Sequence, residues 1–404
     1  MNIDLIFNLT YNSFTGDEMK TLFDYIEEFA NASFKIFQLT EIDNAIFCRL
    51  SYLNFDGFEG KTLKYIAKNF NYTDEESLTK ANKNVVKTED LLKLLGTTKR
   101  YKNVVISNFK ECADENSATA FSATAFKFSD KLYYIAYRGT DDKILSFYED
   151  AELAYDFPIA VQLAALKYTK ELMKKHKGKY VLGGHSKGGN LAMFSFMFLD
   201  KKLKDHVNLV YNNDGPGFPK DLSPVLFTEE NCEKIVNISP EDSIVGRMLE
   251  TCGKRIVVKS SAVAVAQHNL FTWIANGYEF ERAESFSTLS NYVDDSLTAS
   301  LDTLAPDDLK KTVNAIYSIA KNSGLNTLED INKSNYGNIL LSVLQTVKSD
   351  DNASSEAGEI IKTLSKSLIN SVEIEKRLPD IDIGRIKDLI ESKKSETNKE
   401  KIKD

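Results

Sequence analysis

The chain contains the stretch Tyr180-Val-Leu-Gly-Gly-His-Ser-Lys-Gly-Gly-Asn-Leu-Ala192. Its first three residues are typical of an apolar strand, and residues 190–199, rich in Ala, Met, Phe and Leu, are typical of a helix. Between them lies Gly184-His-Ser-Lys-Gly188, a G-x-S-x-G pattern. Where this pattern joins a strand to a helix, the serine occupies a sharp, strained turn with an exposed hydroxyl. We therefore predict that Ser186 is a nucleophile. The alternative is a tight glycine turn with an incidental serine.

The neighbours of Ser186 also receive roles from this pattern. A β-carbon at Gly184 or Gly188 is expected to collide with the adjacent strand or helix. The helix that follows directs the positive end of its dipole at the serine, so the backbone N–H of Lys187 is a predicted oxyanion donor. His185 is expected to point away from the reacting centre and to serve in packing or hydrogen bonding.

Composition excludes several classes of protein. The chain has 404 residues, 42% hydrophobic and 27% charged, which is typical of a soluble globular protein with about two domains, or one large domain and an accessory part. A net charge of −8 argues against a nucleic-acid binder. We find neither an apolar run of membrane-spanning length nor a signal peptide, so we expect a cytoplasmic protein. Peripheral membrane contact and the oligomeric state stay open.

The cysteines and histidines indicate neither a disulfide nor a metal site. The four cysteines, Cys48, Cys112, Cys232 and Cys252, form no C-x-x-C pair, and we expect free thiols in a reducing compartment. The chain has four histidines and no H-E-x-x-H spacing. We therefore expect no metal and no cofactor.

Strands alternate with helices through the middle of the chain. Strands are expected at 118–128, 132–137, 180–182, 207–211, 234–238 and 255–259, with a hairpin turn at 129–131 and a helix over 158–173. This alternation predicts an α/β fold, a mostly parallel sheet with helices on both faces. In such a sheet the site lies at the carboxyl ends of the strands.

Helical patterns flank this region. Residues 1–100 read mainly as helices and loops, a helical layer ahead of the sheet. Apolar residues recur at helical spacing in 309–320, 339–347 and 360–374, and the tail from about 392 is polar enough to be disordered. We therefore expect a catalytic domain over 1–284 and a helical appendage over 285–404. The appendage packs on the body, or docks a membrane surface or a partner.

A serine nucleophile needs a base, and the base needs a carboxylate that fixes its tautomer. In a fold with this turn the chain order is Ser, acid, His, and only His206 and His268 follow Ser186. His206 precedes a strand, at the wrong end of the sheet, whereas His268 follows the last strand. We predict that His268 is the base.

The acid has two main candidates. Asp242 follows the strand 234–238, two strands after the nucleophile, and this is the commoner placement and our preferred assignment. Asp214 follows the strand 207–211, and its stretch Asn-Asp-Gly-Pro-Gly also has the composition of a plain turn. Glu241 is a lesser competitor, one residue out of register.

A second oxyanion donor is expected from the loop Tyr137-Arg-Gly-Thr140, at the end of a strand. Thr140 is the donor through its N–H, and Arg138 is interpreted as holding the loop through carbonyls or a carboxylate. This loop, with Gly184-His-Ser-Lys-Gly188, resembles class 3 lipases of the α/β-hydrolase superfamily. Leu50-Ser-Tyr-Leu-Asn-Phe55 and Asn213-Asp-Gly-Pro-Gly-Phe218 extend the resemblance to a bacterial lipase-like branch, the Mbeg-like group.

The resemblance covers roughly residues 40–280 and implies ester chemistry without fixing a lipid substrate. We therefore predict an α/β-hydrolase fold and a serine hydrolase that cleaves carboxylic esters, with an acyl ester or phospholipid-type ester as substrate. The same residues would serve an acyltransferase if another alcohol replaced water. The rival hypothesis is a non-catalytic interaction protein on a hydrolase scaffold, in which residues 285–404 do the work.

Overall fold

The structure is a computed structural model of the chain. It describes residues 19–35, 38–74, 77, 82–114, 119–140, 152–153, 155–288, 290, 291 and 310. The helices expected at 309–320, 339–347 and 360–374, and the tail from 392, lie outside the described residues except for residue 310. Within the described ranges, none of the helices has the length and apolar character of a membrane span.

Seven strands form one sheet, and their order across the sheet is their order along the chain. They are β1 Val105–Asp114, β2 Thr119–Ser129, β3 Leu132–Tyr137, β4 Lys179–His185, β5 Val207–Asn213, β6 Ile235–Pro240 and β7 Lys254–Val258. The first three pair antiparallel, and β3 to β7 pair parallel. The prediction of a mixed α/β fold with a mostly parallel sheet is confirmed.

The hairpin expected around 129–131 is the β2–β3 pair, but β1 was not predicted. Its sequence does not alternate cleanly between apolar and polar residues, and in the structure the register shifts between Ile106 and Asn108. After β7, two short 3-10 turns lead to Trp273: η3 Ala264–His268 and η4 Leu270–Thr272. A two-residue pair, β8 Ala275–Asn276 and β9 Glu279–Phe280, follows.

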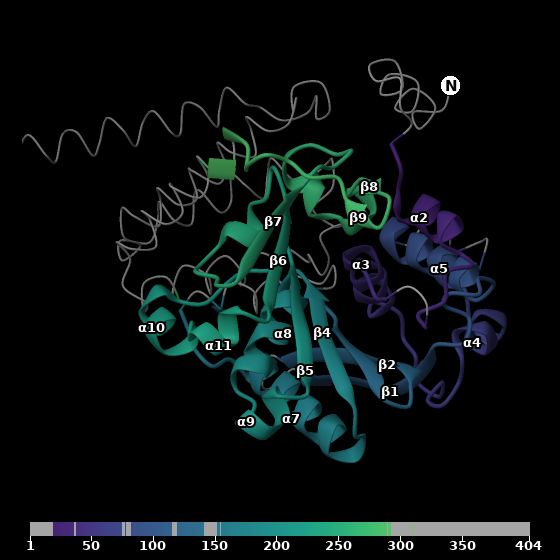
Figure 1. Cartoon of the computed structure of the whole chain (residues 1–404), viewed down its shortest axis with the longest axis horizontal. Coiled ribbons are helices and arrows are strands. Elements are labelled where there is room, and N and C mark those ends of the chain that lie inside the picture. Colours follow the sequence, from purple (N-terminus) through teal and green to yellow (C-terminus); the bar gives the residue numbers. More distant parts are fainter. Residues whose placement is uncertain are drawn as a thin grey trace, which may run out of the picture.

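The helices that connect the parallel strands cover one face of the sheet. Because the parallel strands add in one direction and such crossovers are right-handed in about 98% of cases, the connecting helices are expected on the same side. The main ones are α7 Ala160–Lys175 and α8 Lys187–Met197, with the shorter α9 Lys201–Lys204, α10 Ser223–Leu226 and α11 Glu229–Cys232. Apolar residues of α7 and α8 share a core with Tyr133, Ile135 and Tyr137 of β3, and Figure 1 shows the connecting helices beside the sheet.

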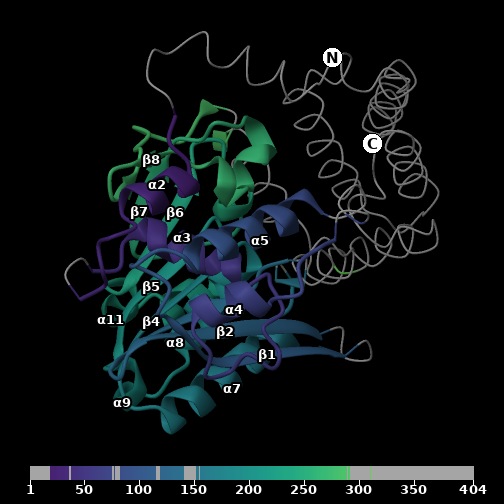
Figure 2. The same ribbon diagram turned by 90° about the vertical axis from the view of Figure 1, so that its right-hand side faces the viewer.

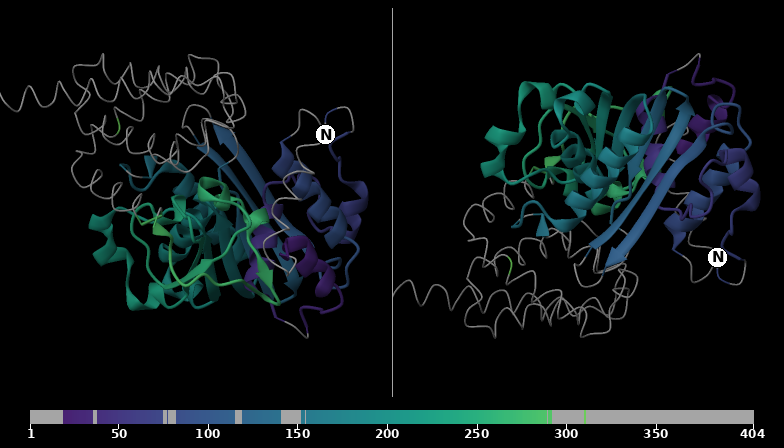
Figure 3. Two further views of the ribbon diagram at one scale, coloured as in Figure 1. Left: turned by 90° about the horizontal axis from the view of Figure 1, so that it is seen from above. Right: turned by 90° about the horizontal axis from the view of Figure 1, so that it is seen from below.

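The other face is covered by helices that precede the sheet in sequence. These are α2 Leu22–Glu28, α3 Glu41–Leu50, α4 Leu63–Asn69 and α5 Lys83–Leu95. They share a second core with Tyr134 and Ala136, the residues of β3 that alternate with the first set. Figure 2 shows this layer, and the views in Figure 3 place the two helical layers on opposite sides of the strands. The expected helices within residues 1–100 therefore supply the face that the crossover helices leave uncovered.

A buried carboxylate at the start of α3 ties this N-terminal layer together. Asp43 caps the helix with Thr40, accepts a hydrogen bond from Arg100 Nε at 3.0 Å and accepts another from the Tyr101 hydroxyl at 2.5 Å. Burial and the charge of Asp43 raise the pKa of Tyr101 well above its ordinary value, so the phenol keeps its proton and donates. Because both ionic side chains are fully buried, removing one partner would leave an uncompensated charge in the core.

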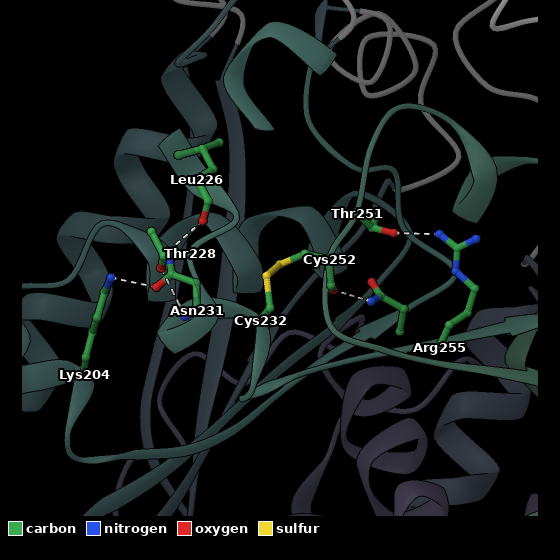
Figure 4. The surroundings of a disulfide bond; sticks show 9 residues. Lys204, Leu226, Thr228, Asn231, Cys232, Thr251, Cys252 and Arg255 are labelled. Carbon is green, nitrogen blue, oxygen red and sulfur yellow. Dashed lines mark hydrogen bonds between the residues drawn. A yellow bond between two sulfur atoms is a disulfide. The ribbon is translucent and has the colours of Figure 1, made fainter. Parts of the chain in front are cut away.

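Two cysteines are paired, contrary to the expectation of free thiols. Cys232 at the end of α11 and Cys252 before β7 form a disulfide with 5.3 Å between their Cα atoms, as Figure 4 shows. They meet because the segment before β7 folds back on the loop after β5, where Glu250 forms a bridge with Phe218. Cys48 and Cys112 are free thiols.

Four loops leave the sheet at one edge and carry the residues singled out from sequence. These loops follow β3, β4, β5 and β6 and carry, in that order, Thr140, Ser186, Asp214 and Asp242. Since these strands run parallel, their carboxyl ends lie together, as expected for an α/β site.

Candidate active site

Ser186 occupies a strained turn between β4 and α8. Its backbone has φ 57° and ψ −135°, a conformation that costs a residue with a side chain about 1–3 kcal/mol. Its N–H donates to the carbonyl of Asn213 on the neighbouring strand, at 3.0 Å. Only 6% of the residue is exposed, less than the open turn that the motif predicts. The strand–turn–helix context expected for a nucleophile is therefore present, in a largely covered position.

The two glycines of the motif are required by packing. A β-carbon at Gly184 would collide with the backbone of Gly188, and a β-carbon at Gly188 would collide with the carbonyl oxygen of Tyr137 on β3. This confirms the steric reason inferred from the sequence. The first turn of α8 can lie against β3 and β4 only because both positions lack a side chain.

The Arg-Gly-Thr loop after β3 runs directly against Ser186. A β-carbon at Gly139 would lie 3.1 Å from the β-carbon of Ser186 and would collide with the carbonyl of His185. Thr140 is the next residue, and Lys187 is the first residue of α8. Both predicted oxyanion donors therefore belong to segments that adjoin the serine. Arg138 pairs with the carboxylate of Glu111 at 2.6 Å, which confirms its interpretation as a residue that holds this loop.

His268 hydrogen-bonds to Asp214, not to Asp242. The contact joins His268 Nδ1 and Asp214 Oδ2 at 2.7 Å. Asp214 follows β5, and β5 is the strand that pairs with β4 and its serine, whereas Asp242 follows β6, one strand further away. The preference for Asp242 as the partner of His268 is therefore wrong, and the alternative Asp214 holds that place.

The turn of Asp214 fixes its carboxylate as well as the chain direction. Asp214 has a positive φ of 50° and is buried, and its N–H donates to the carbonyl of Ile238 at 2.8 Å. Its second carboxylate oxygen accepts the Ser243 hydroxyl at 2.5 Å. One oxygen therefore faces His268 while the other is held by a fixed donor, which determines how the carboxylate is oriented.

Asp242 instead supports the loop that carries His268. Its N–H donates to Gln267 Oε1 at 2.9 Å, and its carboxylate accepts from Gln267 Nε2 at 2.9 Å. The carbonyl of Gln267 in turn accepts the indole N–H of Trp273 at 2.8 Å. Glu241, the lesser competitor, is partly buried, and this burial raises its pKa. These two hydrogen bonds join Asp242 to the residue before the base, and the carboxylate that contacts the His268 imidazole is that of Asp214.

The structure agrees with the prediction for His206 and amends the prediction for His185. His206 lies at the opposite edge of the sheet, where its carbonyl accepts from Tyr180 at the start of β4. His185 is buried and lies beside His268, with 4.5 Å between the ring centroids. It hydrogen-bonds as expected, but toward the base rather than away from the site.

An amide network beneath the serine was not predicted. Asn213 Nδ2 donates to the carbonyl of Gly184 at 3.0 Å. Its Oδ1 accepts from Asn44 of α3 at 2.8 Å, and Asn44 Oδ1 accepts the Tyr134 hydroxyl at 2.6 Å. Polar residues ending a strand that is otherwise apolar were the signal available in the sequence. These bonds join the N-terminal layer to the turn that carries Ser186.

In the described part of the chain, no cluster of three or more His, Cys, Asp or Glu side chains is arranged to hold a metal ion.

A family model described as Mbeg1-like matches residues 95–318, more than half of the chain. The chain belongs to the Mbeg1-like family. The matched range includes the strands, Ser186, Asp214 and His268, but not the N-terminal helices. No curated protein is similar enough to the chain to count as a relative.

Solved structures similar to this Mbeg1-like chain include lipases. The M37 lipase is 17% identical with a TM-score of 0.35, over 52% of this chain and 70% of that one. The Rhizomucor miehei lipase in its propeptide complex is 15% identical with a TM-score of 0.29, over 38% and 57%. A mutant form of MDLA from Penicillium cyclopium is 12% identical with a TM-score of 0.32, over 60% and 84%. At these values, the three structures carry no weight in assigning the residues of the site.

Proposed function

We propose that this protein is a serine hydrolase that cleaves carboxylic esters through an acyl-enzyme on Ser186, with His268 as the base and Asp214 as the residue that orients it. One observation carries the proposal: the 2.7 Å contact of His268 Nδ1 with a buried carboxylate, at the sheet edge where Ser186 occupies a strained turn. A hydroxyl nucleophile, an imidazole and a fixed acid in this chain order are the parts that acyl transfer needs.

In the acylation step, Ser186 Oγ attacks the ester carbonyl carbon, and its proton passes to His268 Nε2. The carbonyl π electrons move to oxygen and give a tetrahedral oxyanion. When this collapses, the C–O bond to the alcohol breaks, and His268 returns the proton to the leaving oxygen. Asp214 accepts the Nδ1–H, which leaves the Nε2 lone pair for the serine proton and stabilises the imidazolium.

We assign the oxyanion to the backbone N–H groups of Lys187 and Thr140. The first lies at the positive end of the α8 dipole, and the second follows Gly139, which packs against Ser186. Removing one donor of this kind costs about 100- to 1000-fold in kcat. Water then attacks the acyl-enzyme with His268 as base, releasing the acid and restoring Ser186.

The proposed substrate class rests on this chemistry and on the resemblance of the motifs to class 3 lipases. An acyl ester or a lipid ester is the proposed substrate, and the steps use only side chains, backbone N–H groups and water. The mostly parallel sheet with the nucleophile after β4 supports an α/β-hydrolase fold, and residues 1–284 are the proposed catalytic domain. An acyltransferase would use the same residues with an alcohol in place of water.

A fluorophosphonate probe tests the proposal, because it reacts with a serine only when a base activates that serine. We expect the wild-type protein to be labelled, and we expect Ser186→Ala and His268→Ala to lose the label. Asp242→Asn is the matched control, since Asp242 binds Gln267 rather than His268. An unlabelled wild type would favour the non-catalytic interaction protein, and equal labelling of Ser186→Ala would refute Ser186 as the nucleophile.

A further inference from the structure

His185, the residue before the nucleophile, contacts His268 in two ways. Its ring lies beside the His268 ring, tilted by 37° with 4.5 Å between centroids, and its Nε2 lies 2.7 Å from the main-chain carbonyl oxygen of His268. The ring of His185 is also buried. The immediate neighbour of the nucleophile in sequence therefore holds the backbone of the base, which comes from a loop 83 residues further along the chain.

Only one arrangement of protons fits the contacts of His185. A carbonyl oxygen accepts hydrogen bonds and cannot donate, so Nε2 carries the proton. Burial, with the nearby charges of His268 and Arg49, lowers the pKa of His185 well below its ordinary value, so the ring is neutral near pH 7 and Nδ1 has a lone pair. The Tyr52 hydroxyl lies 3.1 Å from Nδ1 and is therefore the donor.

Tyr52 is itself fixed at the junction of three segments. It follows α3, in the Leu50–Phe55 motif that the proposed mechanism leaves without a role. The Arg49 guanidinium lies 4.4 Å from the centre of its ring. A β-carbon at Gly139 would come within 2.6 Å of its hydroxyl, so that hydroxyl also adjoins the Arg-Gly-Thr loop.

The base needs such a support because His268 ends a short 3-10 turn rather than a helix or strand. The Asp214 contact fixes Nδ1 but leaves the ring free to pivot about that atom. The His185 contact is a second fixed point, on the main chain of His268. It prevents this rotation and directs His268 Nε2 at one place. Because His185 is neutral, it does this without placing a positive charge beside the imidazolium that forms during acylation.

We propose that Tyr52 and His185 are positioning residues for the base: the Tyr52 hydroxyl fixes the His185 tautomer, and His185 Nε2–H anchors the main chain of His268. This inference rests on the proposed function, since it concerns the orientation of the catalytic base. It also assigns a role to the N-terminal layer, which delivers Tyr52. A packing role alone would require only the shape of the His185 ring.

The two roles separate in a matched pair of substitutions, His185→Gln and His185→Met. Glutamine keeps an N–H donor near the Nε2 position, and methionine has a similar shape without a donor. We expect His185→Gln to keep the fluorophosphonate labelling rate within about fivefold of wild type. We expect His185→Met to lose at least about tenfold more than His185→Gln, because a misplacement of the order of 1 Å costs up to about 100-fold. Equal rates for the two variants would overturn the proposal.

Tyr52→Phe provides a gentler test if both substitutions at 185 impair folding. It removes one hydroxyl and leaves the ring under Arg49, and we expect a two- to tenfold slower labelling rate with little change in the melting temperature. At 1.36 kcal/mol per tenfold change in rate, this is about 0.4–1.4 kcal/mol of activation free energy, as for the loss of one hydrogen bond. A labelling rate equal to that of wild type would overturn the assignment of Tyr52 as a positioning residue.

Nitrogen-15 NMR of the histidine rings tests the geometry independently of catalysis. The chain has four histidines, so the spectrum is simple to assign with single substitutions. We expect His185 at pH 7 to be the neutral Nε2–H tautomer, and the His268 ring signals to move in His185→Met but much less in His185→Gln. A charged His185 or an Nδ1–H tautomer would overturn the proposal. If the wild type and all variants fail to react with the fluorophosphonate while His185 has the expected tautomer, the proposed function is refuted rather than this geometry.

Discussion

Replacing Asp214 by asparagine removes the charge that orients His268 while keeping the size of the side chain. The carboxylate is buried and its two oxygens have different partners: the Ser243 hydroxyl at 2.5 Å and His268 Nδ1 at 2.7 Å. In Asp214→Asn the amide oxygen is expected to occupy the position of the carboxylate oxygen that accepts the Ser243 hydroxyl. The NH2 group then faces Nδ1 and donates to it, which moves the imidazole proton to Nε2.

With a proton on Nε2, His268 no longer accepts the serine proton. The wrong tautomer in a serine–histidine–aspartate site costs about 10⁴ in kcat, equivalent to about 5.5 kcal/mol in the activation free energy. We expect Asp214→Asn to lose between about 10³ and 10⁴ in kcat/KM for a p-nitrophenyl ester. The melting temperature should change little, because the asparagine keeps the hydrogen bond with Ser243.

The matched control is Asp242→Asn, the acid that the sequence favoured. Its carboxylate binds Gln267 at 2.9 Å, so the loop that carries His268 is weakened while the ring keeps its partner. We expect kcat/KM within about tenfold of wild type, since the asparagine oxygen can still accept from Gln267 Nε2 and only the charge of the acceptor is lost. Full activity in Asp214→Asn with a thousandfold loss in Asp242→Asn would refute the reasoning.

Three further outcomes follow from other parts of the fold. Asp43→Asn should lower the free energy of unfolding by about 3–5 kcal/mol, because it breaks a buried ion pair, whereas Asp90→Asn on the surface should cost at most about 1 kcal/mol; urea unfolding compares them. Since the pKa of His185 is depressed below 6.5, the unfolded chain takes up a proton below that pH that the folded protein does not. The free energy of unfolding should therefore fall with decreasing pH by up to about 1.4 kcal/mol per unit from this residue, and His185→Gln should make the slope shallower, while His176, whose pKa burial also lowers, keeps its contribution; a slope unchanged in the variant would contradict it. Cys232→Ser should cost about 3 kcal/mol, as expected for a disulfide that closes a loop of 20 residues, and no loss would mean that the bond is not formed in solution.

The sequence predicted the parts of the site that depend on local pattern. The strand, the glycines and the helix around Ser186 follow from residue types at fixed spacing, and the edge of the sheet follows from strand direction. His206 could be set aside for the same reason, because it precedes β5 rather than following it.

The acid and the disulfide depend on which strands are neighbours, and periodicity does not give that order. The residues around Asp214 have the composition of a turn, and Asp214 does lie in a turn, with a positive φ. The same turn, on the strand next to the serine, also directs the carboxylate at His268. Cys232 and Cys252 meet only because the segment before β7 returns to Phe218. The sequence predicts that His185 points away from the reacting centre, because it cannot reveal contacts with Tyr52 and His268, both distant in sequence.

The central claim is that Ser186 carries an acyl group during turnover. Rapid acid quenching of the protein with a slowly deacylated p-nitrophenyl ester, followed by intact and peptide mass spectrometry, tests it directly. We predict one added acyl group, on the peptide that contains Ser186, and none in Ser186→Ala. An acyl group on another residue would contradict the account. Ester turnover that proceeds without an adduct and persists in Ser186→Ala would contradict it as well.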